Sequence, residues 1–199
     1  MNNTGIIILA AGSSSRFGGI KQLIQFNNKT LIQNVIDEAT NAELNPVIVV
    51  TGAYADEVSK KIDNKKITIV FNEHWERGMA SGIVTGLQKA LIVSKEIENI
   101  IIAVCDQPFI SSMLFQQLSD KKRKSGKSIV ASSYAGTLGT PALFSKKYFN
   151  ELLNLKGDEG AKSLIRKYDS ETTSVLFKKG NIDVDTQKDY EELLKNSTR

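Results

Sequence analysis

The chain has 199 residues, of which 41% are hydrophobic, 24% charged and 7% aromatic, as in an ordinary soluble globular protein. Cys105 and His74 are the single cysteine and the single histidine, which excludes a disulfide framework within the chain and zinc sites built from Cys and His pairs. The net charge of +4 suits anionic small ligands and is too small to indicate a nucleic-acid-binding protein.

The first apolar run, Ile6–Ala10, lies close to the amino terminus and has no basic residue before it. It is too short for the apolar part of a signal peptide or for a membrane span. No later run approaches the ~20 apolar residues that a spanning helix needs. We therefore expect a cytoplasmic protein that has no membrane partner.

Short apolar runs rich in β-branched residues alternate with helical patterns along the first two thirds of the chain. These runs lack the polar–apolar alternation of a half-exposed strand, which indicates strands of a parallel sheet covered on both faces. The predicted strands are Ile6–Ala10, Val47–Thr51, Ile67–Phe71, Ile100–Val104 and Ile129–Ser132.

The segments between these strands predict helices. Apolar residues share one helical face from Leu31 to Ala39 and again from Ile83 to Leu91. Asp56 and Ser111 are predicted N-caps of the helices that follow the second and fourth strands. Strands that alternate with helices indicate βαβ units, so we expect the α/β fold class and a single domain over residues 1–199.

The last third of the chain has a less regular pattern. A loop is predicted at Tyr134–Thr140, and a strand at Pro141–Phe144 follows it. Beyond that strand the sequence predicts helical segments at Lys146–Leu155 and Glu159–Tyr168, a strand at Ser174–Lys178 and a helix from about Gln187.

The loop after the first strand, Leu9–Lys21, is rich in Gly and Ser and carries two cations. It contains neither the G-x-G-x-x-G of dinucleotide-binding folds nor the spacing of a P-loop. Small residues let main-chain N–H groups approach a polyphosphate, and Arg16 and Lys21 supply positive charge. This pattern favours a phosphate-binding loop over a turn with two solvated cations.

Two acidic positions extend this hypothesis. Asp106 lies just past the fourth strand, with one residue between them, at the sheet edge where ligands bind in such folds. There it is either a ligand for Mg²⁺ or a helix cap. Asp183 and Asp185 lie two residues apart near the carboxyl end of the chain, where an extended segment directs both side chains to one side. Asp106 with Asp185 is the predicted metal pair, although Asp185 could also cap the last helix.

Six motifs together resemble the MobA-like nucleotidyltransferases, and among them most closely the molybdenum cofactor cytidylyltransferases. They occur in order along nearly the whole chain, and the D-Q-P and G-D-E-G-A-K motifs are the ones more particular to the cytidylylating branch. The motifs are L-A-A-G-S-S-S-R-F-G-G-I-K-Q-L at Leu9–Leu23, R-G-M-A-S-G-I-V-T-G-L at Arg77–Leu87, C-D-Q-P at Cys105–Pro108, G-T-P-A-L-F at Gly139–Phe144, L-K-G-D-E-G-A-K at Leu155–Lys162 and I-D-V-D-T at Ile182–Thr186.

The resemblance implies a three-layer α/β/α, Rossmann-like fold with a mostly parallel sheet. It also implies a Mg²⁺-dependent transfer of CMP from CTP to the terminal phosphate of molybdopterin, with release of pyrophosphate. Relatives that transfer GMP carry L-A-G-G in the first motif, so Ala11 favours CTP over GTP as the nucleotide partner. The resemblance is also compatible with a protein partner, namely a client molybdoenzyme that receives the cofactor.

The same resemblance implies roles for individual residues. Lys21, Arg16 and Asp106 are the implied catalytic residues, and Asp106 and Asp185 the implied metal ligands. The implied nucleotide-binding residues are Leu9, Ala10, Ala11, Gly12, Ser13, Arg16, Lys21, Gly78, Met79 and Ser81. The implied acceptor-binding residues are Gly139, Thr140, Pro141, Asp158 and Lys162.

Several alternatives stay open on the sequence. Asp158 is either part of an acceptor-phosphate site or simply the N-cap of the helix that follows it. Phe17 stands where Met is usual, Asn27-Asn28 replaces a turn of the P-x-G type, and Gln187 replaces a frequent Pro. None of these departures removes a charged residue that the resemblance implies to be catalytic. The competing functions are a sugar- or polyol-phosphate nucleotidyltransferase and a non-catalytic carrier of molybdenum cofactor.

Overall fold

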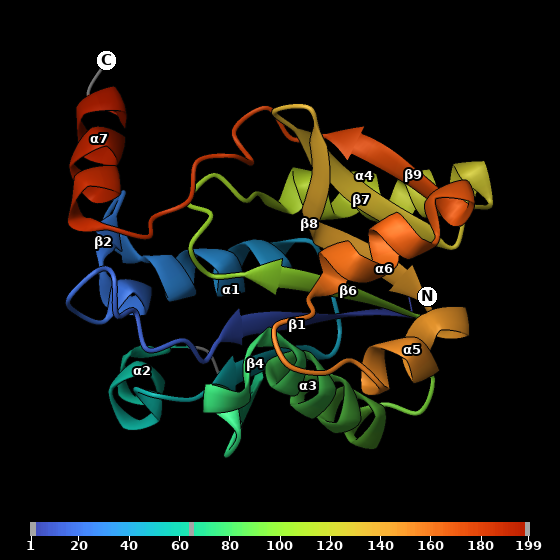
Figure 1. Ribbon diagram of the computed structural model, residues 1–199, viewed down its shortest axis with the longest axis horizontal. Helices are drawn as coiled ribbons and strands as arrows, with labels where there is room; N and C mark the ends of the chain where they lie inside the picture. The colour runs from blue at the N-terminus through green and yellow to red at the C-terminus, as the bar shows by residue number, and fades with distance from the viewer. Residues whose placement is uncertain (1–2, 64–65, 198–199) are drawn as a thin grey trace.

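The computed structural model describes residues 3–63 and 66–197. Within these ranges its centre is a seven-stranded sheet in the order β5-β4-β1-β6-β8-β7-β9 (Figure 1). The strands are β1 (Thr4–Ala10), β4 (Val47–Thr51), β5 (Thr68–Phe71), β6 (Asn99–Val104), β7 (Ile129–Tyr134), β8 (Thr137–Ser145) and β9 (Thr172–Leu176).

The sheet is mostly parallel, as predicted. β1 pairs in parallel with β4 and β6, β4 with β5, and β7 with β9. Only β8 among these strands runs the other way, antiparallel to both β6 and β7. The carboxyl ends of the parallel strands therefore meet at one edge, on the left in Figure 1, and the loops that follow them gather there.

The predicted loop at Tyr134–Thr140 is wrong. The chain instead makes a hairpin in which β7 continues to Tyr134 and β8 begins at Thr137. Ala135 and Gly136 form its turn with φ values of 46° and 72°, which suits a two-residue connection between antiparallel strands. The strand predicted from Pro141 is thus the second half of a longer one. β9 also lies two residues earlier in the chain than predicted.

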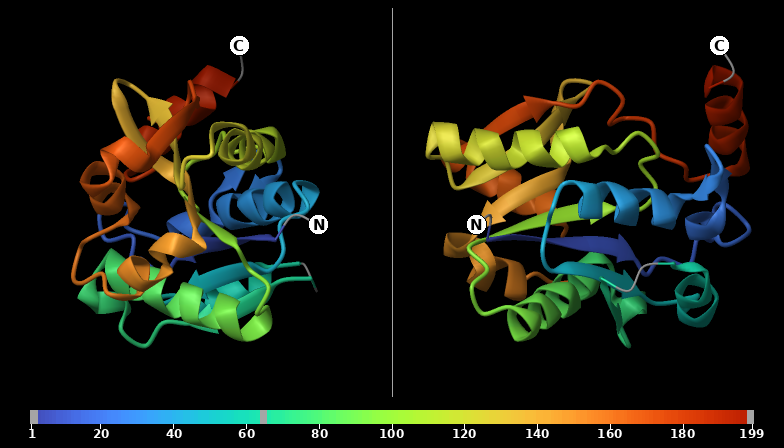
Figure 2. Two further views of the ribbon diagram at one scale, coloured as in Figure 1. Left: turned by 90° about the vertical axis from the view of Figure 1, so that its right-hand side faces the viewer. Right: turned by 180° about the vertical axis from the view of Figure 1, so that it is seen from behind.

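Helices cover both faces of the sheet and make the three-layer fold (Figure 2). One face carries α1 (Leu31–Asn41), α2 (Ala55–Lys61) and α4 (Ser112–Ser125), and the other carries α3 (Met79–Val93), α5 (Phe149–Leu153) and α6 (Ala161–Lys167). β1 shows how the strands serve both layers, because Ile6 and Ile8 belong to the first core cluster and Ile7 to the second. All three side chains are fully buried, which explains the unbroken apolar run.

The two predicted N-caps have different outcomes. Ser111 caps α4, since its Oγ accepts a hydrogen bond from Leu114 N at 3.3 Å. Asp56 does not cap α2: the turn from Gly52 starts the helix at Ala55, and Tyr54 occupies the N-cap without a side-chain bond. Asp56 lies inside the first turn, where its charge still complements the helix dipole.

A third, smaller core cluster lies beyond the carboxyl edge of the sheet. There α7 (Gln187–Ser197) packs outside the two helical layers, against a hairpin of β2 (Gln25–Phe26) and β3 (Lys29–Thr30) (Figure 1). The buried residues of this third cluster are Phe17, Phe26, Leu31, Val184 and Leu193. The hairpin turn is Asn27-Asn28, and both residues have positive φ, which asparagine tolerates.

In the described residues no helix combines the length and apolar character needed to cross a bilayer.

Candidate functional site

The first loop is held in shape by Gln22, whose side chain is buried beneath it. Its Nε2 donates to the carbonyl oxygens of Ala10 at 3.1 Å and Gly12 at 2.9 Å. Ser14 Oγ donates to Gln22 Oε1 at 3.2 Å. The amide thus ties the end of β1 to the Gly/Ser loop. Sequence reasoning missed Gln22, although it directly follows Lys21.

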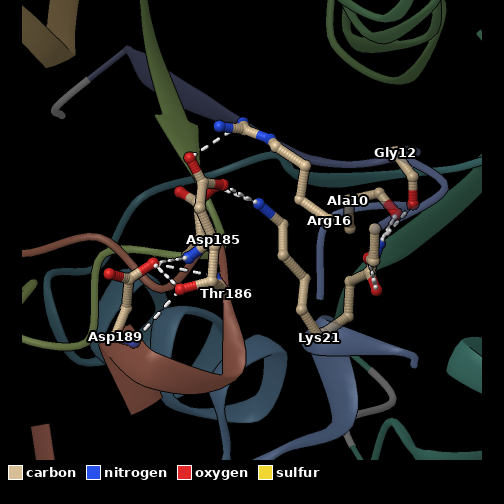
Figure 3. A network of polar contacts seen from close by, with 10 residues as sticks. Ala10, Gly12, Arg16, Lys21, Asp185, Thr186 and Asp189 are labelled. Atoms are coloured by element: carbon tan, nitrogen blue, oxygen red, sulfur yellow. Dashed lines mark hydrogen bonds and ion pairs between the residues drawn. The ribbon is translucent and has the colours of Figure 1, made fainter. Parts of the chain in front are cut away.

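Four charged side chains from three distant segments meet beside this loop, and Figure 3 labels three of them, Arg16, Lys21 and Asp185. Lys21 Nζ donates to Asp106 Oδ2 at 2.6 Å and to Asp185 Oδ1 at 2.9 Å. Arg16 Nη2 donates to Asp185 Oδ2 at 2.9 Å. The two carboxylates predicted as a metal pair therefore converge on a single cation. We call Arg16, Lys21, Asp106 and Asp185 the charge cluster.

The charge cluster is partly withdrawn from water. The Lys21 side chain is 15% exposed and that of Asp106 20%, whereas Arg16 is 73% exposed. Burial alone lowers the pKa of Lys21, but the ion pair and hydrogen bond with Asp106, aided by Asp185, outweigh it and raise that pKa above its ordinary value. Lys21 is therefore an ammonium group throughout the neutral range.

Two neighbours of the cluster have raised pKa values. Burial, reinforced by the negative charge of Asp106, raises the pKa of the Cys105 thiol to about 12, so that Cys105 is protonated and unreactive near neutral pH. The pKa of Asp183 is also raised, mainly because the side chain is partly buried and secondly because the negative charge of Asp106 lies near it. Asp183 is the third carboxylate at this edge.

A cavity of about 450 Å³ opens between the first loop and the start of α3. Residues predicted to bind nucleotide line much of it, namely Leu9, Ala10, Ala11, Gly12, Ser13, Lys21, Gly78 and Met79. Trp75, Glu76, Asn72 and Asp158 also line it and were not predicted to do so. Ser81 supports the wall instead, because its Oγ lies 2.8 Å from the carbonyl oxygens of both His74 and Gly78 and its single hydrogen can be donated to either one. We call this space the first cavity.

A second cavity of about 630 Å³ lies on the other side of the charge cluster. Its lining includes Arg16, Thr140, Asp158, Lys162 and Asp183. Lys21, Met79, Val104, Asp106 and Asp158 line both cavities, so the two spaces adjoin at the charge cluster. The arrangement can hold two ligands whose reactive ends meet beside Lys21 and Asp106.

Tyr134 and Gln107 line the second cavity and shape it, although no site role was predicted for either residue. A Cβ atom at Gly139 would collide with the Tyr134 hydroxyl, and one at Gly180 with its ring. Gln107 Nε2 donates to the carbonyl oxygens of Thr140 at 3.2 Å and Gly180 at 2.8 Å. The absence of a side chain at Gly139 thus leaves room for the Tyr134 hydroxyl. The carbonyl oxygen of Pro141 accepts a hydrogen bond from Ser132 Oγ at 2.7 Å.

The segment 157–160 closes over the start of α3. Ala80 N donates to Gly157 O at 3.1 Å, and a Cβ atom at Gly78 would collide with Gly157 and Asp158. Gly78 has a φ of 91°, a conformation that residues with a Cβ rarely adopt. Asp158 is not the N-cap of α6, because Gly160 occupies that position. The cap interpretation of Asp158 is therefore wrong, and its side chain faces both cavities.

A family model described as the MobA-like NTP transferase domain matches residues 6–172. "Purine catabolism protein PucB" of Bacillus subtilis is 27% identical over 196 residues, with 93% of each chain covered. "Molybdenum cofactor cytidylyltransferase" of Escherichia coli is 22% identical over 191 residues, which cover 96% of this chain and 95% of the relative. "Nicotine blue oxidoreductase" of Paenarthrobacter nicotinovorans is 31% identical over 106 residues, which span 53% of this chain and 50% of that protein.

Solved structures show the same fold. The homologue of Mycobacterium tuberculosis Rv0371c from Mycobacterium sp. strain JC1 superposes with a TM-score of 0.84 at 29% identity, covering 100% of this chain and 98% of that one. Rv0371c of M. tuberculosis H37Rv, in a complex with manganese, gives a TM-score of 0.77 at 26% identity, covering 96% and 97%.

Proposed function

Because the chain belongs to the MobA-like NTP transferase family, we propose that it transfers CMP from CTP to the terminal phosphate of molybdopterin and releases pyrophosphate. The observation that carries this proposal is the charge cluster between two adjoining cavities. The first cavity would take the nucleotide and the second the acceptor. The relationship to a molybdenum cofactor cytidylyltransferase supports the choice of acceptor.

The choice of CTP over GTP rests on Ala11. A Cβ atom at Gly52 would collide with Ala11 and with Trp75, so these residues pack closely at the wall of the first cavity. Ala11 itself lines that cavity. Relatives that transfer GMP carry L-A-G-G where this chain has L-A-A-G, and this difference favours CTP.

We propose Mg²⁺ as the metal and Asp106 and Asp185 as its protein ligands. Both carboxylates already contact one cation, the Lys21 ammonium, so their oxygens are directed at a common point. In the described chain no group of three or more His, Cys, Asp or Glu side chains could hold a metal. Two carboxylates suit Mg²⁺, which completes its shell with water and substrate phosphates. When bound, it would supply charge that offsets the triphosphate and the leaving pyrophosphate.

In the proposed reaction the side chains of this protein offset negative charge and need not transfer a proton. A phosphate monoester has a second pKa near 6, so the attacking oxygen of the acceptor is largely ionised at neutral pH and needs no general base. The difficulty is repulsion, because two unit charges 4 Å apart repel by about 4 kcal/mol at an effective dielectric constant of 20. Lys21 and Arg16, the two cations of the charge cluster, would bind and orient the triphosphate and offset this repulsion.

Pyrophosphate release tests the proposal when measured with CTP and GTP, each with molybdopterin, a sugar phosphate and a polyol phosphate. We expect release with CTP and molybdopterin, and loss of release in Asp106→Ala. Lys21→Ala should lower kcat by about 10²–10³-fold, with a smaller effect on nucleotide affinity, because the ammonium acts mainly on charge that develops in the transition state.

Each other outcome rejects part of the proposal. Release with a sugar or polyol phosphate but not with molybdopterin would move the enzyme to that class. Cofactor binding without release from any nucleotide would indicate a carrier. Lys21→Ala with wild-type turnover would reduce Lys21 to a solvated loop cation.

A further inference from the structure

Asp185 lies in the irregular segment between β9 and α7, yet its main chain is held at several points. Asp189 Oδ2, one turn into α7, accepts hydrogen bonds from Asp185 N at 3.1 Å, Thr186 N at 2.7 Å and Thr186 Oγ1 at 2.8 Å (Figure 3). Asp189 N in turn donates to Thr186 Oγ1 at 3.2 Å. Thr186, not Asp185, therefore caps α7, in a reciprocal capping box.

The carboxylate of Asp189 does more than an ordinary cap requires. One oxygen receives three donors, and one of these is the amide of Asp185 itself. The hydrogen bond from the Thr186 hydroxyl lowers the pKa of Asp189, so the side chain is ionised at neutral pH. An ionised acceptor makes the stronger, charge-assisted kind of hydrogen bond.

The helix that carries this box is itself anchored to the rest of the site. Leu193 is 2% exposed in the third core cluster, Tyr190 donates its hydroxyl to Gln25 O at 2.8 Å, and Gln187 Nε2 donates to Phe17 O at 3.2 Å. Val184 N donates to Asp106 O at 3.0 Å. α7 is thus fixed to the loop that carries Arg16 and Lys21, and its leading segment to the loop of Asp106.

We propose that Thr186 and Asp189 are positioning residues, which hold Asp185 where its carboxylate meets Lys21 and Arg16. The inference deepens the proposed function, since it concerns the same site. It adds α7, which lies outside residues 6–172, the part that the family model matches. The competing interpretation is a cap that stabilises α7 and has no effect on the charge cluster.

The test is the rate at which an amine-acylating reagent modifies Lys21, measured by mass spectrometry in metal-free protein and normalised to the exposed Lys124. Lys21 is shielded while two carboxylates hold its ammonium group. Asp189→Ala should release Asp185 and raise the Lys21 rate at least about fivefold, the order expected when one charge-assisted hydrogen bond is lost. Asp189→Asn keeps an oxygen acceptor but loses the charge, so it should raise the Lys21 rate less than Asp189→Ala does.

Two further variants separate positioning from stability. Thr30→Ala removes the matching side-chain cap of α1, where Thr30 accepts from Gln33 N, and should leave Lys21 labelling unchanged. Thr186→Val removes the hydroxyl of the capping box and keeps the side-chain shape. It should raise the Lys21 labelling rate, as Asp189→Ala does, and it tests the positioning role if Asp189→Ala does not fold.

The proposal is overturned if Asp189→Ala and Thr186→Val label like wild type, or if Thr30→Ala raises labelling as much as they do. The assay uses no nucleotide, metal or acceptor. Failure of the proposed reaction would therefore leave its result intact, and a negative labelling result would leave the proposed reaction standing.

Discussion

Lys21 and Arg16 are both positively charged, but they differ in burial and therefore in how much their ion pairs contribute to stability. Lys21 is 15% exposed and contacts two carboxylates, so its replacement leaves Asp106 without its cation and leaves Asp185 with Arg16 alone. Arg16 is 73% exposed and contacts Asp185 alone. An exposed ion pair contributes little to stability, so the contribution of Arg16 is expected towards a bound anion.

Cys105 provides a prediction on pH dependence. Burial raises its pKa from 9.0 to about 12, so the folded state holds a proton that the unfolded state releases. Its contribution to stability is complete below pH 9 and is lost as pH rises towards 12. Between pH 9 and 10.5 the free energy of unfolding should fall by about 1.5 kcal/mol from this group.

Urea unfolding of wild type and Cys105→Ala at pH 8, 9 and 10.5 measures this effect. The window ends at 10.5 because Lys21, whose pKa is raised from 10.5, begins to contribute in the same direction above it. Cys105→Ala should show a shallower alkaline decline than wild type. Equal declines in the two proteins would contradict the assignment.

The sequence predicted the charged residues of the site better than the residues that hold them. Asp106 could be proposed because it follows a strand at the sheet edge where ligands bind, whereas Asp185 was paired with it from the I-D-V-D-T segment and the family resemblance. Gln22 and Gln107 lie inside motifs of the family resemblance and Asp189 lies outside them, but no role could be assigned to any of the three. Their partners are mostly main-chain atoms, which any residue type supplies, so the sequence does not show which contacts they make.

At the scale of elements, prediction succeeded where both faces of a strand are buried. β4 occupies Val47–Thr51 as predicted, because every residue in it is buried and apolar or β-branched. The hairpin of β7 and β8 was missed because Thr137–Thr140 is mixed in polarity and only partly buried. This half of β8 borders the second cavity, where polar side chains are retained for the site.

The docking of segment 157–160 on α3 gives a prediction for Gly78. Gly78→Ala should cost about 1–3 kcal/mol of stability, because φ of 91° is strained for alanine and the new methyl group meets Gly157 and Asp158. It should also raise the KM for nucleotide, since Gly78 and Asp158 both line the first cavity.

Gly126→Ala is the matched control for Gly78→Ala. Gly126 also has positive φ, at 70°, but ends α4 with nothing within 4 Å of a Cβ atom. It should cost about 1 kcal/mol or slightly more and leave the KM for nucleotide unchanged. Denaturant unfolding and nucleotide kinetics on both variants measure the difference. A rise in KM in both variants, or in neither, would contradict the role given to the docked segment.

At the scale of the whole molecule, the site is an assembly of three segments far apart in the chain. Lys21 is 85 residues from Asp106 and 164 from Asp185. The parallel sheet brings the first two segments together, and this could be predicted from its topology. The third arrives through α7 and the small cluster beyond the sheet, where short contacts between distant residues decide the packing.

The central claim is that this assembly holds a nucleoside triphosphate and a divalent metal at one cleft. A crystal structure of the protein with Mn²⁺ and a non-hydrolysable CTP analogue tests it most directly, because anomalous scattering locates the metal. We predict the metal peak at the carboxylates of Asp106 and Asp185, with the triphosphate against Lys21 and Arg16 and the base in the first cavity. A metal peak away from both carboxylates, or a nucleotide bound outside the first cavity, would contradict the account.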